Sequence, residues 1–326
     1  MVPAPTADDL EALRTTLTAY CYRLLGSAAD TDDAVQDTII RAHHHRQEYD
    51  PARGALRTWV FRIATNICLD LLRGKRRRAL CVDLGPAAAA GAELGSPLPP
   101  DRFVEPMPDA RLVAARDPGE VVAERESVRL AFVAALQHLA PRQRATLVLR
   151  DVLCFSAAET ADMLGTTTAA VNSALQRARE TLDRHRPSIS DPLGSGDAGQ
   201  RHLLGRYVAA FEAHDVARLA ELLCADARTS MPPFGWWLEG GATIAALVGA
   251  GGCAGARLSP TVISGQPGFG QYRPDGHGLL RPFALVLVEP RGERIAHLTT
   301  FLGTGDRFPE FGLSMVLEPQ LVSHDR

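Results

Sequence analysis

The chain has 326 residues, enough for two or three domains at roughly 100–200 residues per domain. Apolar residues make up 46% and charged residues 22%, and mean hydropathy is −0.05, so the composition fits a globular protein with apolar cores. The formal net charge of −3 argues against nucleic acid when taken over the whole chain, but a DNA-binding surface depends on the charge of one domain.

Two further classes are excluded by the sequence pattern. The six cysteines are scattered and form no CxxC pair, which indicates reduced thiols and neither a zinc site nor a disulfide framework. The first residues lack a basic and an apolar signal region, and no run approaches the roughly 18–20 apolar residues of a membrane span. We therefore expect a cytoplasmic protein with no membrane partner.

Residues 8–78 are expected to be helical with short breaks. Leucines and Tyr20 recur at three- and four-residue steps from residue 10 to 24, and Gly26 should end that helix. Thr31 is the expected cap of the next helix, which has an acidic first turn. Pro51 and Gly54 then interrupt the pattern.

The helix that follows, in "LRTWVFRIATNICLDLLRGKRRR" (56–78), combines an apolar stripe with a basic end. Its apolar stripe consists of Leu56, Val60, Ile63, Ile67 and Leu71. A second stripe carries Arg62, Asn66 and Arg73 toward the basic residues 75–78. Between Arg57 and Arg78 seven basic residues face one acid, Asp70. Such a surface suits phosphate contacts, but a solvated helix with a basic end explains the pattern equally well. Trp59 is either core or a platform for an unpaired base.

Residues 81–116 hold six prolines and no apolar period, so we expect a linker. Helices return over 117–185 and include a helix capped by Ser156, a turn at Gly165 and a second helix from about Thr168, the order of a helix-turn-helix. Ala170, Val171, Ala174, Leu175 and Ala178 should form its inner side. The alternative is an ordinary surface helix. The polar residues expected to read DNA are Thr167, Thr168, Asn172, Ser173, Gln176, Arg177 and Arg179.

A second linker (186–199) precedes a region of a different class (200–320). Helices are expected at 200–213, 216–223 and 241–249. Strand-like runs follow at 257–264, 268–274, 282–290 and 294–303. This order indicates an α+β domain with an antiparallel, curved sheet.

Three stretches in this order, "DTDDAVQDTIIRA", "LRTWVFRIATNICLDLLRGKRRR" and "LAPRQRATLVLRDVLCFSAAETADMLGTTTAAVNSALQRARETL", resemble bacterial sigma factors of the extracytoplasmic-function (ECF) group. The resemblance covers about 10–80 and 117–185, and residues 200–320 are similar to a SnoaL-like (NTF2-like) cone. It implies a multidomain protein: a helical bundle (sigma region 2, 8–80), a linker (81–116), a helix-turn-helix (region 4, 117–185), a second linker (186–199) and the α+β cone (200–320).

The resemblance also implies partners and roles. Core RNA polymerase would be bound at its β′ clamp by Asp33, Gln36, Asp37 and Arg41, and at its β flap by region 4. The loop 48–55 would hold a flipped base of the −10 promoter element. The rest of the −10 strand would meet Arg57, Trp59, Arg62, Asn66, Arg73, Lys75 and Arg76. The helix-turn-helix would read the −35 element, although the family's V-K-S-R-L run is here Val171-Asn172-Ser173-Ala174-Leu175, with two basic positions lost.

The C-terminal domain offers Trp236, Trp237, Glu239 and His297 for a pocket that could take a small-molecule ligand, with His277 and Arg281 as further polar groups. No acid–base pair is evident, and the DGGGK-type motif of one subgroup is absent. We therefore expect a regulatory domain in place of a separate anti-sigma factor, and not an enzyme. The alternative is a SnoaL-like isomerase fused to a DNA-binding module. Three consecutive histidines, 43–45, point to different sides of a helix, so we expect no metal site and no cofactor.

Overall fold

The computed structural model describes residues 4–113, 124–184 and 198–318. The chain forms two compact units. The helical unit contains the described residues up to Leu80 and from Asp101 to Arg184. The C-terminal unit contains Cys81–Pro100 and the residues from Ala198 onward. Each unit is described below by itself.

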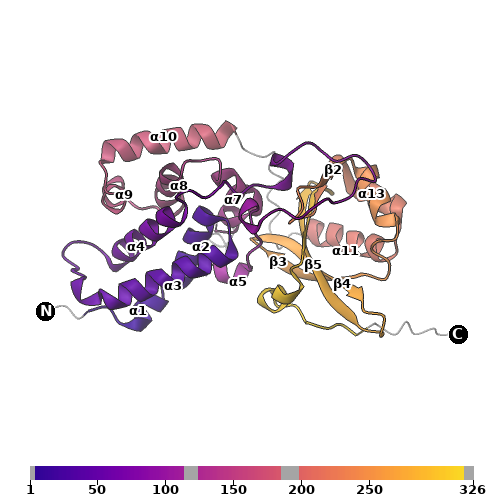
Figure 1. Ribbon diagram of the computed structural model, residues 1–326, viewed down its shortest axis with the longest axis horizontal. Helices are drawn as coiled ribbons and strands as arrows, with labels where there is room; N and C mark the ends of the chain where they lie inside the picture. Colours follow the sequence, from indigo (N-terminus) through magenta and orange to yellow (C-terminus); the bar gives the residue numbers. More distant parts are fainter. Residues whose placement is uncertain (1–3, 114–123, 185–197, 319–326) are drawn as a thin grey trace. The chain divides into compact units, whose positions relative to one another are not determined.

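The first half of the helical unit consists of α1 (Ala7–Glu11), α2 (Arg14–Leu25), α3 (Ala28–His44), the short η1 (Arg46–Glu48) and α4 (Leu56–Leu71) (Figure 1). Gly26 ends α2 with a left-handed backbone (φ +66°), as expected. Ser27 caps the start of α3. The prediction that Thr31 would cap this helix is wrong. Thr31 lies inside the helix, where its hydroxyl donates to the Ser27 carbonyl oxygen.

The second half contains α5 (Asp109–Leu112), α7 (Leu130–Leu136), α8 (Pro141–Leu147), a π-turn (Val148–Val152), α9 (Ala157–Leu164) and α10 (Thr168–Arg184). Ser156 and Glu159 form a reciprocal capping box at the start of α9, and Gly165 ends it with φ +59°. The helix expected from residue 117 is interrupted at Arg129, and its residues 117–123 lie outside the described ranges.

One apolar core joins both halves of the helical unit. Tyr20, Val60 and Phe61 from α2 and α4 share it with Leu149 and Phe155, which lie before α9. The Phe61 and Phe155 rings are 5.4 Å apart, and both side chains are buried. The two sequence blocks therefore pack on each other and are not independent bundles in this conformation.

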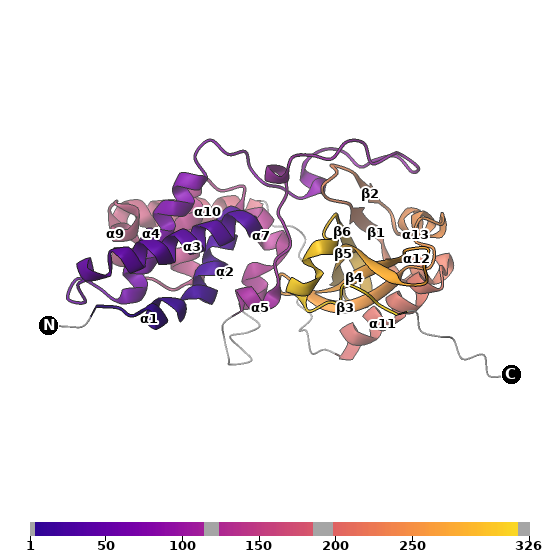
Figure 2. The same cartoon turned by 60° about the horizontal axis from the view of Figure 1, so that its bottom comes forward.

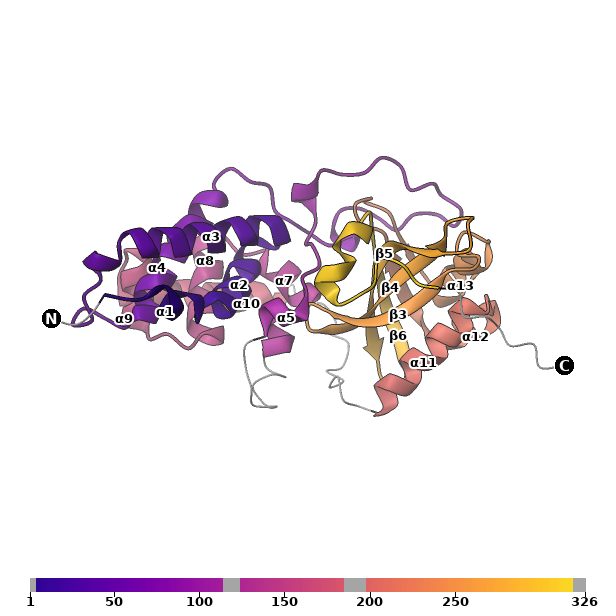
Figure 3. The same ribbon diagram turned by 90° about the horizontal axis from the view of Figure 1, so that it is seen from below.

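The C-terminal unit places α11 (Ala198–Glu212), α12 (Val216–Leu222) and α13 (Gly241–Gly249) along one face of a curved six-stranded sheet (Figures 2 and 3). The strands are β1 (Leu223–Ser230), β2 (Trp237–Glu239), β3 (Arg257–Ile263), β4 (Gln266–Pro274), β5 (Leu280–Arg291) and β6 (Arg294–Leu302), in the order β2-β1-β6-β5-β4-β3. The short η5 (Gly305–Phe311) follows β6.

The α+β fold class of this unit is confirmed, but the expectation of a purely antiparallel sheet is wrong. β1 pairs with β6 in parallel, whereas the other neighbouring strands are antiparallel. A helix and four strands separate β1 from β6 in the chain, so no hairpin forces them to run in opposite directions.

The expected linker 81–116 divides between the units along its described part. Residues 81–100 run beside the β2 edge of the C-terminal sheet (Figure 2): the Ala88 amide donates to Trp237 O (2.8 Å), and the Leu98 amide donates to Pro233 O (2.8 Å). In the helical unit, Glu105 accepts hydrogen bonds from the Ser27 hydroxyl (2.9 Å) and the Ala28 amide (2.7 Å).

Candidate nucleic-acid interface

The exposed face of α3 carries the four residues expected to bind polymerase. Asp33, Gln36, Asp37 and Arg41 all point away from the core, and Arg41 lies 4.0 Å from Asp37. The structure adds a residue that the sequence reasoning missed: Ile40 is 42% exposed in the middle of this face. The sequence could have revealed Ile40, because it is an apolar residue that falls outside the periodic buried positions of α3.

A cavity of about 570 Å³ is lined by the end of α3, the loop before α4, α4 itself and Asp162 of α9. Trp59, Arg62 and Asn66 all line it, so the structure brings these predicted residues together. Tyr49 from the expected base-binding loop places its ring 5.5 Å from the Trp59 ring. Trp59 also packs against the core, and so it serves as core and cavity wall at once.

Arg57 lies apart from that group. Its guanidinium donates to Leu153 O (3.1 Å) and stands 4.2 Å from the centre of the Phe155 ring. Burial lowers the pKa of this guanidinium, and the negative charge of Glu159 acts in the opposite direction, to raise that pKa. The Arg57 guanidinium therefore binds the second half of the helical unit, at Leu153 and Phe155.

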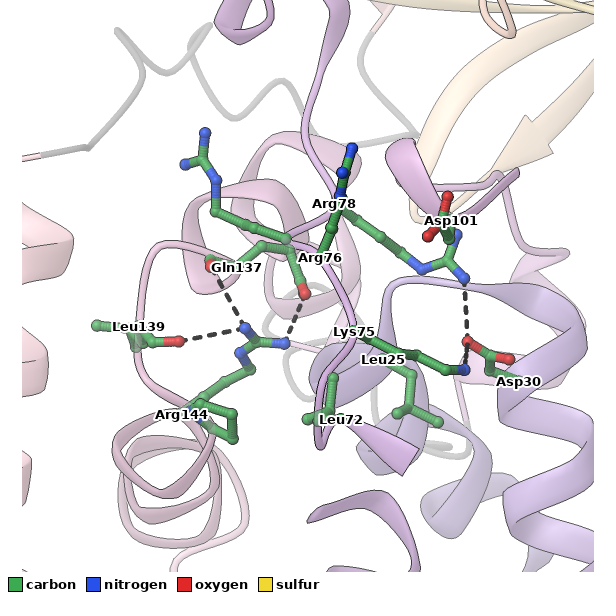
Figure 4. Close-up of a pocket in the computed structure, with 12 residues that line it drawn as sticks. Leu25, Asp30, Leu72, Lys75, Arg76, Arg78, Asp101, Gln137, Leu139 and Arg144 are labelled. Carbon is green, nitrogen blue, oxygen red and sulfur yellow. Dashed lines mark hydrogen bonds and ion pairs between the residues drawn. The ribbon is translucent and has the colours of Figure 1, made fainter. Parts of the chain in front are cut away.

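The basic residues 73–78 lie beyond the last turn of α4, because the helix ends at Leu71 and Gly74 takes a left-handed backbone (φ +74°). Arg73 is exposed beside Asp70 (3.1 Å), and Arg76 is also exposed. Lys75 and the buried Arg78 both bind Asp30 (2.9 and 3.0 Å; Figure 4). Burial acts to raise the pKa of Asp30, but these two hydrogen bonds and their charges hold it below its usual value. Asp30 therefore reduces the positive charge of the block.

A small cavity of about 140 Å³ beside this block is lined by Arg144 from α8. Arg144 donates to the side chain of Gln137 and to the backbone of Leu139 (Figure 4). Burial lowers its pKa to about 10. Its bonds to backbone carbonyls hold the end of α7 in place.

α10, the helix expected to read DNA, presents its predicted polar side to solvent. All seven residues assigned to the −35 element are exposed: Thr167, Thr168, Asn172, Ser173, Gln176, Arg177 and Arg179. Val171, Leu175 and Ala178 are buried as expected, but Ala170 is exposed, so the inner side is narrower than predicted. Arg179 pairs with Asp151 (2.7 Å), and Arg177 donates to the Ser173 hydroxyl (3.3 Å).

The two tryptophans of the C-terminal unit bind the chain segment 81–100. The indole N–H of Trp236 donates to Ala92 O (3.2 Å), and that of Trp237 donates to Gly85 O (2.9 Å). Both side chains are buried. The Cys81 thiol donates to Phe234 O (3.2 Å), and burial raises its pKa to about 12.

His297 lies within a polar group that the sequence did not predict. Its Nε2 is 3.2 Å from the Ser230 hydroxyl, and its Nδ1 is 3.7 Å from Glu289 Oε1. Glu289 and His297 are register partners on β5 and β6, while Val288 and Leu298 beside them enter the core under the helices. The polar pair therefore occupies the opposite face of the sheet. No local motif marks Glu289 or Ser230, because only strand register brings them together.

The other predicted polar residues of this unit have separate partners. Glu239 pairs with Arg228 (3.3 Å) across β1 and β2. Asp275 accepts from the His277 amide (2.8 Å) and from Arg281 (3.1 Å) in the β4–β5 connection. Across the described ranges, no group of three or more His, Cys, Asp or Glu side chains is arranged to hold a metal ion. The described helices include none that is long and apolar enough to cross a membrane.

Comparison with known proteins identifies two family regions. The chain matches the model of Sigma-70 region 2 over residues 10–78 and that of Sigma-70, region 4 over residues 129–182. Both matches coincide with the two sequence blocks and lie in the helical unit.

Relatives match over a longer stretch. The chain is 46% identical over 309 residues to the ECF RNA polymerase sigma factor SigG of Mycobacterium tuberculosis, covering 93% of this chain and 82% of that protein. It is 31% identical over 218 residues to SigJ of the same organism, covering 67% of this chain and 62% of SigJ. The crystal structure of SigJ has a TM-score of 0.61 and 23% identity, with 95% of this chain and all of that chain covered, which shows a shared fold. The chain belongs to the ECF RNA polymerase sigma factors, the non-enzymatic transcription factors that bind core RNA polymerase and promoter DNA to initiate transcription.

Proposed function

We propose that this sigma factor divides its contacts among three surfaces. The exposed side of α3 binds the β′ clamp, the cavity at α4 holds an unpaired base of the −10 element, and α10 reads the −35 element in the major groove while region 4 meets the β flap. The observation that carries the proposal is the convergence of Trp59, Arg62 and Asn66 on one cavity.

The chemistry of this cavity suits a melted strand. Extruding a base costs a few kcal/mol, whereas stacking it on an aromatic ring returns about 1–3 kcal/mol per base. Trp59 and Tyr49 supply aromatic faces, Arg62 supplies charge for a phosphate, and Asn66 supplies an amide for a base edge or sugar.

Transcription from a mapped promoter with purified core polymerase tests this assignment. The promoter is first found by mapping transcripts after overexpression. Trp59→Ala should reduce open-complex formation by about fivefold or more, in line with about 1–3 kcal/mol per stacked base. Asn66→Ala should reduce it by about twofold to tenfold, in line with about 0.5–1.5 kcal/mol for one hydrogen bond. Arg218→Gln, at a 74% exposed side chain in α12, is the control for a substitution away from the cavity and should leave open-complex formation unchanged. Normal open complexes with Trp59→Ala would refute the cavity assignment.

We further propose that the C-terminal unit regulates initiation in place of a separate anti-sigma protein. The support is its hold on residues 81–100, part of the chain that joins region 2 to region 4. Any restraint on this segment restricts how far the two DNA-binding regions can separate.

A further inference from the structure

The small cavity beside the residues that follow α4 has a strongly basic wall. Its volume is about 140 Å³, and Figure 4 shows side chains from α3, from the segment after α4 and from the α7–α8 region around it. The charged side chains that line it are the basic Lys75, Arg76, Arg77, Arg78 and Arg144 and the acidic Asp30 and Asp101. Basic groups therefore outnumber acidic ones in the wall, and the cavity attracts anions.

Arg144 is a buried cation without a counter-ion among the described residues. It is 4% exposed, and burial lowers its pKa with no acidic group of the described chain acting in the other direction. Its outer nitrogens donate only to neutral acceptors: the carbonyl oxygens of Leu24, Gln137 and Leu139 and the amide oxygen of Gln137. Buried charges in proteins are normally paired, because removing an isolated ion from water is costly.

One donor of the same guanidinium is also unused. A guanidinium carries five N–H groups, one on Nε and two on each Nη. The Nη groups of Arg144 bind the four acceptors named above, whereas Nε is buried and has no hydrogen-bond acceptor in the described part of the chain. Such a buried, unsatisfied donor is rare in folded proteins. A water molecule would supply the acceptor alone, but an anion supplies both the acceptor and the counter-charge.

Arg76 and Arg77 also leave their charge open to an anion. Arg76 is exposed and makes no hydrogen bond or ion pair with the described residues. Arg77 donates to the ring of His138, which carries no negative charge. Asp101 acts against an anion, but these two arginines and Arg144 outnumber it. The other acid of the wall is already bound by two cations.

The size of the cavity selects the kind of anion. Drug-sized ligands occupy about 300–1,000 Å³, so a cavity of about 140 Å³ is too small for a whole nucleotide. At about 30 Å³ per water molecule, it has room for roughly four or five waters, which a phosphate or diphosphate group would replace. A nucleic-acid strand needs a groove that follows its backbone, and a cavity of this size does not provide one.

We propose that this cavity is a binding site for a small phosphate anion, either inorganic phosphate or diphosphate. Arg144 Nε and the Arg76 guanidinium donate to its oxygens, and Arg77 adds positive charge at the rim. The bound anion completes the hydrogen bonding of Arg144 and links the segment after α4 to α8. The site does not depend on the proposed role of the Trp59 cavity in strand binding.

Equilibrium dialysis of the full-length protein tests the site, with radiolabelled diphosphate and, separately, radiolabelled phosphate as the probes. The ionic strength is fixed at about 0.15 M, where charges more than about 8 Å apart are largely screened. We expect saturable binding, and the anion that binds more tightly identifies the preferred ligand. Arg76→Gln should weaken binding by about tenfold to 100-fold, as loss of one hydrogen bond to a charged group predicts.

Two further variants separate the site from general charge. Arg142→Gln is the matched control, because Arg142 is exposed on the same helix as Arg144 but does not line the cavity. Its affinity should stay within about twofold of wild type. Arg144→Lys keeps the charge but loses the planar fork and its Nε donor, so it should also weaken binding.

Thermal melting followed by circular dichroism gives a second readout. The anion should raise the melting temperature of the wild-type protein, because it binds the folded state, and should raise that of Arg76→Gln less. Melting also shows whether each variant is folded. If Arg144→Lys does not fold, the exposed Arg76 still carries the test.

The outcomes that would overturn the site are distinct. If neither anion binds the wild-type protein saturably, the acceptor of Arg144 Nε is a water molecule. Equal losses in Arg76→Gln and Arg142→Gln would show that general positive charge explains the binding. If a 20-nucleotide single-stranded DNA binds with the same dependence on Arg76 while the free anions do not bind, the basic wall serves a nucleic-acid backbone. None of these results decides the effect of Trp59→Ala, so the anion site and the strand site can fail separately.

Discussion

At the scale of single residues, His297 shows how burial creates a pH dependence. Burial lowers the pKa of its imidazole; Glu289 and Asp83 act to raise it, and Arg228 acts to lower it. The neutral ring is therefore favoured in the folded state. Above the unfolded pKa of 6.5 both states are neutral and the folded state keeps its full stability.

As the pH falls below 6.5, the unfolded chain takes up a proton before the folded chain does, so stability is lost until the folded pKa is reached. We expect the free energy of unfolding of the C-terminal unit to fall from about pH 7.5 to 5.5, by at most about 1.4 kcal/mol per pH unit for one proton. His297→Gln should flatten this slope. Urea unfolding followed by tryptophan fluorescence measures it, and an unchanged slope in the variant would assign the dependence to other groups.

Ile40 tests the polymerase surface at the same scale. Because its side chain is 42% exposed, Ile40→Ala should leave the melting temperature unchanged. We expect it to weaken binding to core polymerase by about 1–2 kcal/mol, the value of covering one aliphatic side chain. Val216→Ala, at the 38% exposed residue of α12, is the matched control. Equal affinities for both variants in a binding titration would remove Ile40 from the interface.

At the scale of elements, helices were more predictable than strands. The apolar period located α4 and α10, and Ser156 with Gly165 marked both ends of α9, because these signals are local. β1 (Leu223–Ser230) follows α12 without a turn residue and has an irregular burial pattern, so its sequence carries no strand period. β2 has only three residues, too few to show any alternation.

The candidate sites divide in the same way. The exposed residues of α3 and α10 follow from helix period and family resemblance. The partners of Trp236, Trp237 and His297 depend on contacts between distant parts of the chain, and so no local pattern reveals them. The same holds for Asp162 beside Arg62, 100 residues apart in sequence.

The recognition helix gives a prediction about promoter sequence. Asn172 and Gln176 are exposed on α10, and their amides suit adenine. Replacing either by alanine should reduce discrimination at one −35 base pair by about 1–3 kcal/mol. Competition binding with single-base −35 substitutions measures this loss. Substitutions in the −10 element provide the control, since wild type and variant should respond to them equally; uniform weakening at every −35 position would instead indicate phosphate contacts.

At the scale of the whole molecule, the chain between region 2 and region 4 passes through the C-terminal unit. The chain leaves the helical unit at Leu80, binds the C-terminal unit over 81–100 and contributes to the helical unit again from Asp101. Twenty extended residues can span about 66 Å at 3.3 Å each. While these residues are bound to the C-terminal sheet, they cannot extend, and so they add no length to the connection between region 2 and region 4.

Releasing the segment should therefore activate the sigma factor. Trp236→Phe with Trp237→Phe keeps an aromatic ring at each position but removes the hydrogen bonds to Ala92 and Gly85. Two hydrogen bonds contribute about 2 kcal/mol, so the ratio of bound to released segment 81–100 should fall by up to about 30-fold. Hydrogen–deuterium exchange in residues 81–100 should accelerate by a similar factor, because the Ala88 and Leu98 amides are protected by their bonds to this unit.

Transcription from the mapped promoter should rise in the same variant, since a free segment lets the two readers separate. Tyr272→Phe is the matched control: it removes one hydrogen bond, from the Tyr272 hydroxyl to Ser314 O (2.7 Å), elsewhere in the unit. Faster exchange with unchanged transcription would show that the segment is bound there without regulating initiation. Unchanged exchange would mean that the tryptophans do not hold the segment, and the regulatory proposal would lose its physical basis.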